Sequence, residues 1–292
     1  MRHHGWRAAA LGLAVIIIIV IAGCATHTPR HDWEDRLRGD AIVLLGEHHQ
    51  NAAHHQQRLE VLRRAFAAGW RPAIAMEQFD REWQADVDRA RRQQPRNAQH
   101  VIDIAAPSAG VRGGNWDWRF YRPFIELAIE YGVPLVAANL SSADISKVVR
   151  GGYAAVFDAD AMTALGLNVA IAPDWQSAQQ REIDDGHCNA LPPSTLPGMA
   201  RGQLARDAVM AAILSTHAAR GVVLIAGNGH VRQDIGVPRW LSETLRARTL
   251  TVGYLEPGAP SALEAAFDAV VRTAASGQPD QCIAFKKRLK PP

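Results

Sequence analysis

The sequence lacks the short motifs that would identify several common enzymes and cofactor sites. It contains no HExxH, no GxSxG and no GK[ST], which counts against a thermolysin-like zinc site, an α/β-hydrolase nucleophile and a phosphate-binding loop. The stretch "GNGHVR" (227–232) lacks the third glycine of a dinucleotide fingerprint. Only three cysteines occur and none lies in a CxxCH motif, which excludes covalent c-type haem attachment.

An excess of charge of one sign is also absent. The chain carries a formal charge of +3, and loss of residues 1–23 would remove two arginines and no acid. The remaining residues would then be close to neutral, with 30 basic and 29 acidic side chains. Because nucleic-acid binding usually needs a strongly basic surface, we expect no nucleic-acid partner.

The N-terminus has the pattern of a targeting segment. Arg2 and Arg7 precede an apolar run (10–24) that is shorter than a membrane-spanning helix needs and ends in "IAGC". This ending resembles the bacterial lipobox, which implies cleavage of a signal peptide (1–23) and acylation of Cys24, with palmitate as one such acyl chain. Ala25 in place of aspartate favours an outer-membrane lipoprotein that faces the periplasm. The alternative is an uncleaved signal anchor.

The rest of the chain divides into three parts. We expect a lipidated tether over residues 24–40, a single domain over 41–285 and a basic tail over 286–292. Once Cys24 is acylated, Cys188 and Cys282 remain. The periplasm is oxidising, so a disulfide between them is the leading interpretation, and two unpaired thiols are the alternative.

Short apolar runs between glycines, prolines and polar residues predict buried β-strands. These runs are 41–46, 72–77, 133–139, 222–226, 248–255 and 267–273, the last at an edge of the sheet. Helical patterns separate them, including a helix that Asn51 caps and a polar helix over 80–94. The sequence therefore predicts an α/β fold, with a mostly parallel central sheet flanked by helices and a helical insertion or lid over approximately 142–220.

Polar residues follow three of these strands, at the edge where parallel sheets bind ligands. Glu47 and His49 follow the first strand, Glu77 ends the second, and Asn228 and His230 follow the fourth. Together they predict either a His/Glu site for a divalent metal or a pocket lined by bases and haem ligands. The plainer alternative is that these histidines only begin helices.

The other histidines have less to distinguish them. We expect His54 and His55 to serve the packing and the first turn of their helix, although His55 is as compatible with a ligand role as with a place in the core. His217 lies in an alanine-rich helix and is expected to be structural.

Five sequence blocks resemble one known family. They are "GEHHQNAAHHQQ", "AMEQFDREWQ", "WRFYRPFIELAIEYGVPLVAANLS", "MARGQLARDAVMAAI" and "VLIAGNGHVRQDIGVP", and in this order they resemble the ChaN-like haem-binding uptake lipoproteins. The wider superfamily includes Tiki/TraB-type metalloproteases and erythromycin esterases. The resemblance covers most of residues 37–255.

The resemblance carries expectations beyond those of the patterns alone. It implies an α/β core with a helical subdomain, non-covalent haem bound at the membrane surface, and a homodimer in which two haems stack face to face. The residues that match the family's blocks are Glu47, His49, Asn51, Glu77, Asn228, Gly229 and His230, whereas Gln50 replaces the aspartate of many relatives. For the axial iron ligand, the candidates are Tyr153 and His187, both in the helical insertion.

The sequence leaves two main functional hypotheses, together with a third in which the protein has neither function. The favoured hypothesis is a haem-binding lipoprotein of haem and iron uptake that performs no catalysis. The alternative is a peptidase or esterase in which His49, Glu77 and His230 act by general base catalysis or through a divalent metal. The third is a scaffold that retains the superfamily's site as a vestige.

Overall fold

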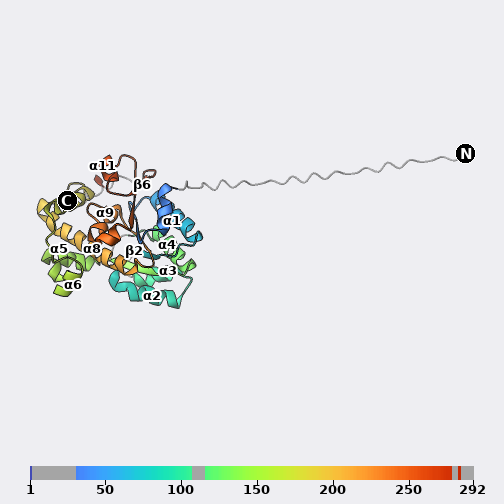
Figure 1. Cartoon of the computed structure of the whole chain (residues 1–292), viewed down its shortest axis with the longest axis horizontal. Coiled ribbons are helices and arrows are strands. Elements are labelled where there is room, and N and C mark those ends of the chain that lie inside the picture. The colour runs from blue at the N-terminus through green and yellow to red at the C-terminus, as the bar shows by residue number, and fades with distance from the viewer. Residues whose placement is uncertain (2–30, 107–115, 278–281, 284–292) are drawn as a thin grey trace.

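A parallel β-sheet lies at the centre of the structure, a computed structural model that describes residues 1, 31–106, 116–277 and 282–283 (Figure 1). Its six strands lie in the order β3-β2-β4-β1-β5-β6, and all neighbouring strands are parallel. Their bounds are β1 (Ile42–Leu45), β2 (Ala73–Asp80), β3 (Leu135–Asn139), β4 (Val222–Ile225), β5 (Thr249–Leu255) and β6 (Ala269–Arg272). All six predicted strands are present, and β6 lies at an edge as predicted.

Successive strand residues point into two different hydrophobic cores, as the pleat of a strand requires. Val43 and Leu45 of β1 belong to one core, and Ile42 and Leu44 belong to the other. All four are fully buried, which explains why the run is apolar without alternation.

Helices cover both faces of the sheet, as predicted (Figure 1). The first core is covered by α1 (Ala52–Ala67), α2 (Gln84–Gln93), α3 (Ala98–Ala105) and α4 (Trp118–Glu130). The second is covered by α8 (Leu196–His217), α9 (Asn228–Val231), α10 (Glu243–Arg246) and α11 (Ser261–Glu264). Asn51 caps α1 as predicted, because its side chain accepts hydrogen bonds from the amides of Ala53 and His54.

The polar helix after β2 begins later than predicted. Asp80 is the last residue of β2, and a 3₁₀ turn over Arg81–Trp83 precedes α2. The side-chain amide of Asn139 donates to the carboxylate of Asp80, 3.2 Å away, and the two residues pair in the β2–β3 ladder. This pairing with β3 extends the strand beyond its apolar run.

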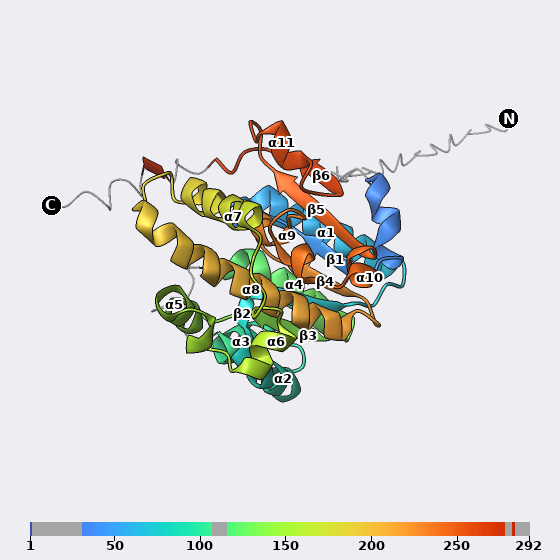
Figure 2. The same ribbon diagram turned by 60° about the vertical axis from the view of Figure 1, so that its left-hand side comes forward.

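The chain between β3 and β4 is helical, as predicted. It forms α5 (Ser142–Gly151), α6 (Ala159–Ala164), α7 (Pro173–Gly186) and α8, with a separate hydrophobic core that includes Leu140, Phe157 and Val209. Figure 2 shows α7 lying along α8, which crosses one face of the sheet.

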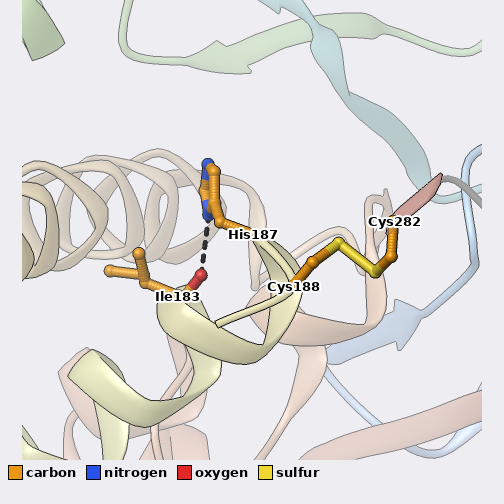
Figure 3. Close-up of a disulfide and its surroundings, with 4 residues drawn as sticks. All are labelled: Ile183, His187, Cys188 and Cys282. Carbon is orange, nitrogen blue, oxygen red and sulfur yellow. Dashed lines mark hydrogen bonds between the residues drawn. A yellow bond between two sulfur atoms is a disulfide. The ribbon is translucent and has the colours of Figure 1, made fainter. Parts of the chain in front are cut away.

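Cys188 and Cys282 form a disulfide, which is the predicted pairing (Figure 3). It joins the loop after α7 to the chain that follows β6. Cys188 itself has a positive φ of 64°, in the left-handed region that non-glycine residues seldom adopt.

Two predicted features at the ends of the chain lie outside the described residues. They are the signal peptide with its acylated Cys24 and the basic tail (286–292). Of the predicted tether, residues 31–40 are described and include a 3₁₀ helix over Asp32–Arg38. Among the helices that the structure describes, none has the length and apolar character required to cross a membrane.

The chain leaves β1 and β4 toward opposite faces of the sheet. After β1, α1 packs Val61 and Leu62 into the first core, and after β4, α9 packs Val231 into the second. Since β1 and β4 are neighbours, a crevice is expected beyond their carboxyl ends, at the position where doubly wound sheets bind ligands.

Candidate functional site

The end of β2 and the turns after β1 and β4 bring four predicted residues together at this edge. Glu47 and His49 follow β1, Glu77 lies near the end of β2, and His230 lies in α9 after β4. The backbone amide of Gly227, which begins the last turn, donates to Glu77 Oε2 at 2.9 Å. Glycine at this position also lets the His49 ring approach, because a Cβ here would lie only 2.9 Å from His49 Cε1.

Glu47 is the centre of a buried hydrogen-bond network. Its Oε1 lies 2.6 Å from His49 Nδ1 and accepts from the Tyr121 hydroxyl at 2.8 Å. Its Oε2 accepts from Arg58 at 3.0 Å and lies 2.7 Å from His55 Nε2. Burial alone would raise the pKa of Glu47, but the Arg58 guanidinium and the two histidines hold that pKa well below its usual range. Glu47 is therefore an anion that orients the groups around it.

His49 is the accessible member of the cluster. Its side chain is 47% exposed, whereas that of Glu47 is fully buried. Trp116 meets the His49 ring edge-on, with the ring centroids 4.7 Å apart. Burial opposes the charged form of the ring, but the hydrogen bond to Glu47 and the charge of Glu77 raise the pKa of His49. The ring is thus held through Nδ1, and no described residue hydrogen-bonds its Nε2.

His230 has the opposite environment, because it lies between two buried carboxylates. Its Nδ1 is 2.5 Å from Asp207 Oδ1 and its Nε2 is 3.3 Å from Glu77 Oε1. Although burial alone would lower it, these two acids raise the pKa of His230 to about 9. The His230 charge in turn brings the pKa of Glu77 to about 2 against the effect of burial, while burial raises the pKa of Asp207. An imidazolium with both nitrogens protonated has no lone pair for a metal.

Asn228 has a structural role rather than the predicted role in the pocket. Its amide nitrogen donates to the carbonyl of Tyr254 at 2.7 Å, and its Oδ1 accepts from the amide of Tyr254 at 3.2 Å. The side-chain amide therefore pairs with the backbone of β5 as the backbone of a neighbouring strand would. Gly46 leaves room for this, because a Cβ there would lie 2.2 Å from Asn228 Oδ1.

The two predicted iron ligands are carried by the helical insertion rather than by the strand-end turns. Tyr153 begins a short 3₁₀ helix after α5 and packs against the third core, and burial raises the pKa of its phenol. His187 ends α7 beside the disulfide, with Nδ1 2.7 Å from the carbonyl oxygen of Ile183 (Figure 3). In Figure 3 the second ring nitrogen of His187 points away from that carbonyl.

The two histidines of α1, His54 and His55, are both buried. His54 Nδ1 accepts from the backbone amide of His48 at 2.9 Å, and burial together with the Arg58 charge lowers the pKa of His54 to about 4. His54 thus serves the start of the helix, as predicted. His55 does more than pack, because it links Arg58 to Glu47 and stacks on Phe120.

Sequence reasoning missed three members of the cluster, namely Arg58, Tyr121 and Asp207. Arg58 is fully buried between Leu45, Glu47 and His55, and Asp207 is the buried partner of His230. A signal was present for two of them. Arg58 lies three residues after His55, on the apolar stripe of α1, and Asp207 interrupts the alanine-rich stretch of α8.

A preformed metal centre is not found in the part of the chain that the structure describes. There, no group of three or more His, Cys, Asp or Glu side chains is arranged to hold a metal ion. The acids and imidazoles of the cluster bond one another instead.

Comparisons with known proteins agree with this architecture. The model of the family described as "Haem-binding uptake, Tiki superfamily, ChaN" matches residues 33–241. A solved structure of ChaN from Campylobacter jejuni, titled for cofacial heme binding, is similar with a TM-score of 0.62 and 18% identity, over 78% of this chain and 87% of that one. No curated protein sequence matches the chain.

Two other solved structures are more distant. An erythromycin esterase, EreC, has a TM-score of 0.44 and 11% identity over 77% of this chain and 75% of its own. A succinoglycan biosynthesis protein has a TM-score of 0.39 and 12% identity over 76% and 68%. Because the family model matches most of the chain, the protein belongs to the ChaN family of haem-binding uptake proteins in the Tiki superfamily.

Proposed function

We propose that the protein is a membrane-anchored, haem-binding lipoprotein that takes part in haem and iron uptake at the outer membrane, facing the periplasm. The observation that carries this proposal is the family match over residues 33–241. The fold shared with Campylobacter ChaN supports it, as does the lipobox-like sequence that ends at Cys24.

The donor set of the cluster fits haem, because it contains one accessible imidazole in the right tautomer. A histidine that binds iron must offer a nitrogen lone pair, and metal-binding histidines usually donate their other N–H to a carboxylate or carbonyl. The hydrogen bond to Glu47 places the proton on Nδ1 of His49 and leaves Nε2 for iron. Haem, when bound, supplies the iron that accepts this lone pair, and the Trp116 ring beside His49 offers an apolar surface to the porphyrin.

We therefore propose His49 as an axial ligand, in addition to the predicted Tyr153 and His187. The carbonyl of Ile183 fixes His187 in the same tautomer, with its proton on Nδ1. Tyr153 would have to lose a proton that burial retains, since its pKa is raised. In the proposed homodimer, the two protomers would together supply the residues that hold the haem.

Hemin titration tests this proposal. The chain without residues 1–23 and with Cys24→Ala should give a saturable, shifted Soret band at micromolar hemin, and a sizing column should show whether loading produces a dimer. Spectra of His49→Ala, His187→Ala and Tyr153→Phe would then identify the ligand. No saturable band with the parent chain would reject haem binding.

Anchoring requires a separate test in cells. With the full chain, radiolabelled palmitate should be incorporated and the protein should sediment with outer membranes. Cys24→Ser should lose both, and a strain that depends on haem as its iron source should then grow more slowly. Labelling that survives Cys24→Ser would contradict the proposed anchor.

A second candidate function is hydrolysis, and one observation favours it. The cluster contains two histidine–carboxylate pairs, His49 with Glu47 and His230 with Asp207. His49 held by Glu47 has the arrangement of a general base that could activate water, with or without a divalent metal. This function predicts peptidase or esterase turnover that His49→Ala abolishes, and turnover unaffected by that substitution would reject it.

A further inference from the structure

A hollow lies beside the helical insertion, apart from the histidine cluster. It encloses about 680 Å³ between α7, α8, the loop after α6 and the 3₁₀ helix Val237–Trp240. We call it the tryptophan hollow, and its apolar wall includes Leu165, Val169, Ile171, Trp175, Ala212 and Trp240. This volume is within the range of pockets that hold small organic ligands.

The rim of the hollow exposes an apolar side chain that has no evident structural purpose. Val169 is 66% exposed and is one of three large hydrophobic residues that the described chain leaves open to solvent. Trp175 and Trp240 pack against each other, with their ring centroids 5.1 Å apart and their planes tilted by 56°. Aromatic and aliphatic walls of this kind bind the apolar body of a ligand.

Most polar groups around the hollow already have hydrogen-bond partners within the protein. The hydroxyls of Thr163 and Ser215 donate to the carbonyls of the preceding helical turn, and Ser242 caps α10. Trp175 donates its indole N–H to the carbonyl of Ile235. These groups are already satisfied within the protein.

Two donors remain without acceptors. The indole nitrogen of Trp240 lacks a hydrogen-bond partner, but it is fully buried and does not open onto the hollow. The exposed guanidinium of Arg239 lies 4.6 Å from the centre of the Trp175 ring, and no acid among the described residues forms an ion pair with it. The lining contains no aspartate or glutamate. Every unmet group is thus a donor, and one of them is a cation.

We propose that the tryptophan hollow binds an amphiphile with an apolar body and a carboxylate head. The head would pair with Arg239, and the body would lie against the aliphatic wall. Histidine, cysteine, methionine and tyrosine are all missing from the lining, so this site would not coordinate iron. A long-chain fatty acid and a metal-free porphyrin with its propionates share this chemistry, and they are the two sources to be distinguished.

Displacement of a fluorescent fatty acid tests the proposal on the chain with Cys24→Ala. Dansylundecanoic acid should bind saturably, oleate should displace it, and oleyl alcohol should do so at least about tenfold less well because it lacks the charge. Protoporphyrin without iron forms the second arm, and displacement by porphyrin alone would assign the site to that source. Absence of saturable probe binding would overturn the proposal.

Two variants and a matched control locate the ligand. Ala212→Phe should fill the hollow and abolish probe binding, and Arg239→Gln should weaken oleate about tenfold while leaving oleyl alcohol unchanged. Arg220→Gln removes an arginine from beyond the end of α8 and should change neither. Equal affinities for Arg239→Gln and Arg220→Gln, or full binding in Ala212→Phe, would contradict the site. Hemin titration of the same variants should be unaltered, which separates this proposal from haem binding.

Discussion

His49 and His230 occupy equivalent places in the sequence and opposite environments in the structure. Each is the last residue of a G-x-x-H turn that follows a buried strand. The side chain of His49 is 47% exposed and bonds one carboxylate, whereas that of His230 is 6% exposed and lies between two. The same turn thus gives one ring that can meet a ligand and one that neutralises buried acids.

Replacement of His230 should have the largest effect on stability. His230→Ala would leave Glu77 and Asp207 buried without their cation, and loss of one partner of a buried ion pair costs about 3–5 kcal/mol. Urea unfolding measures the difference. A loss of less than about 1 kcal/mol would show that the two acids do not depend on this ring.

Stability should also fall at alkaline pH because of the same residue. The pKa of His230 in the folded protein is about 9, above the 6.5 of a free histidine, so its contribution is complete below pH 6.5 and is lost as the pH rises through 9. The difference corresponds to about 3 kcal/mol.

The ring interacts with the charges of Glu77, Asp207 and His49, and Arg206 interacts with the two acids. The pKa of Glu77 is about 2, so this acid stays ionised throughout this range. Unfolding in urea between these pH values should show the fall in the parent chain and not in His230→Asn. Equal slopes in the two proteins would contradict the assignment.

Substitution of Gly227 should displace the ring of His49 without removing any side chain that could bind iron. In Gly227→Ala the new methyl group would meet the His49 ring at 2.9 Å, and we expect hemin affinity to fall about tenfold. Gly229→Ala is the matched control, because its nearest neighbour, Glu182 Oε1, lies at an ordinary 3.8 Å. Equal hemin affinities for the two variants would argue against His49.

The smallest expected effect is the loss of stability in His49→Ala. Glu47 would retain Arg58, Tyr121 and His55, so the free energy of unfolding should fall by less than about 1 kcal/mol. A loss as large as that of His230→Ala, measured by the same urea titration, would remove the contrast between the two rings.

The fold and about half of the cluster could be predicted from the sequence, because short stretches of it contain the necessary signals. Strands buried on both faces are continuous apolar runs, and the residues just after them must lie at one edge of a parallel sheet. Glu47, His49, Glu77 and His230 were found in this way. Burial, however, depends on what covers the edge, so the contrast between the two histidines is visible only in the structure.

The missed residues come from helices. Arg58, Tyr121 and Asp207 reach the cluster from α1, α4 and α8, and their positions depend on how each helix is rotated against the sheet. Local periodicity predicts a buried face but not which buried position meets a carboxylate. Asn228 shows the converse error, since a polar residue at the correct edge bonds to the backbone of a neighbouring strand.

The most direct test of the account is whether free imidazole restores the hemin spectrum of a variant that lacks the His49 side chain. Hemin-loaded His49→Ala should lose the Soret position of the parent chain and recover it when free imidazole is added, because the small molecule can occupy the space beside Glu47. His48→Ala, which removes the neighbouring exposed histidine, should keep the parent spectrum throughout. A His49→Ala spectrum identical to that of the parent, before any imidazole is added, would contradict the role of His49.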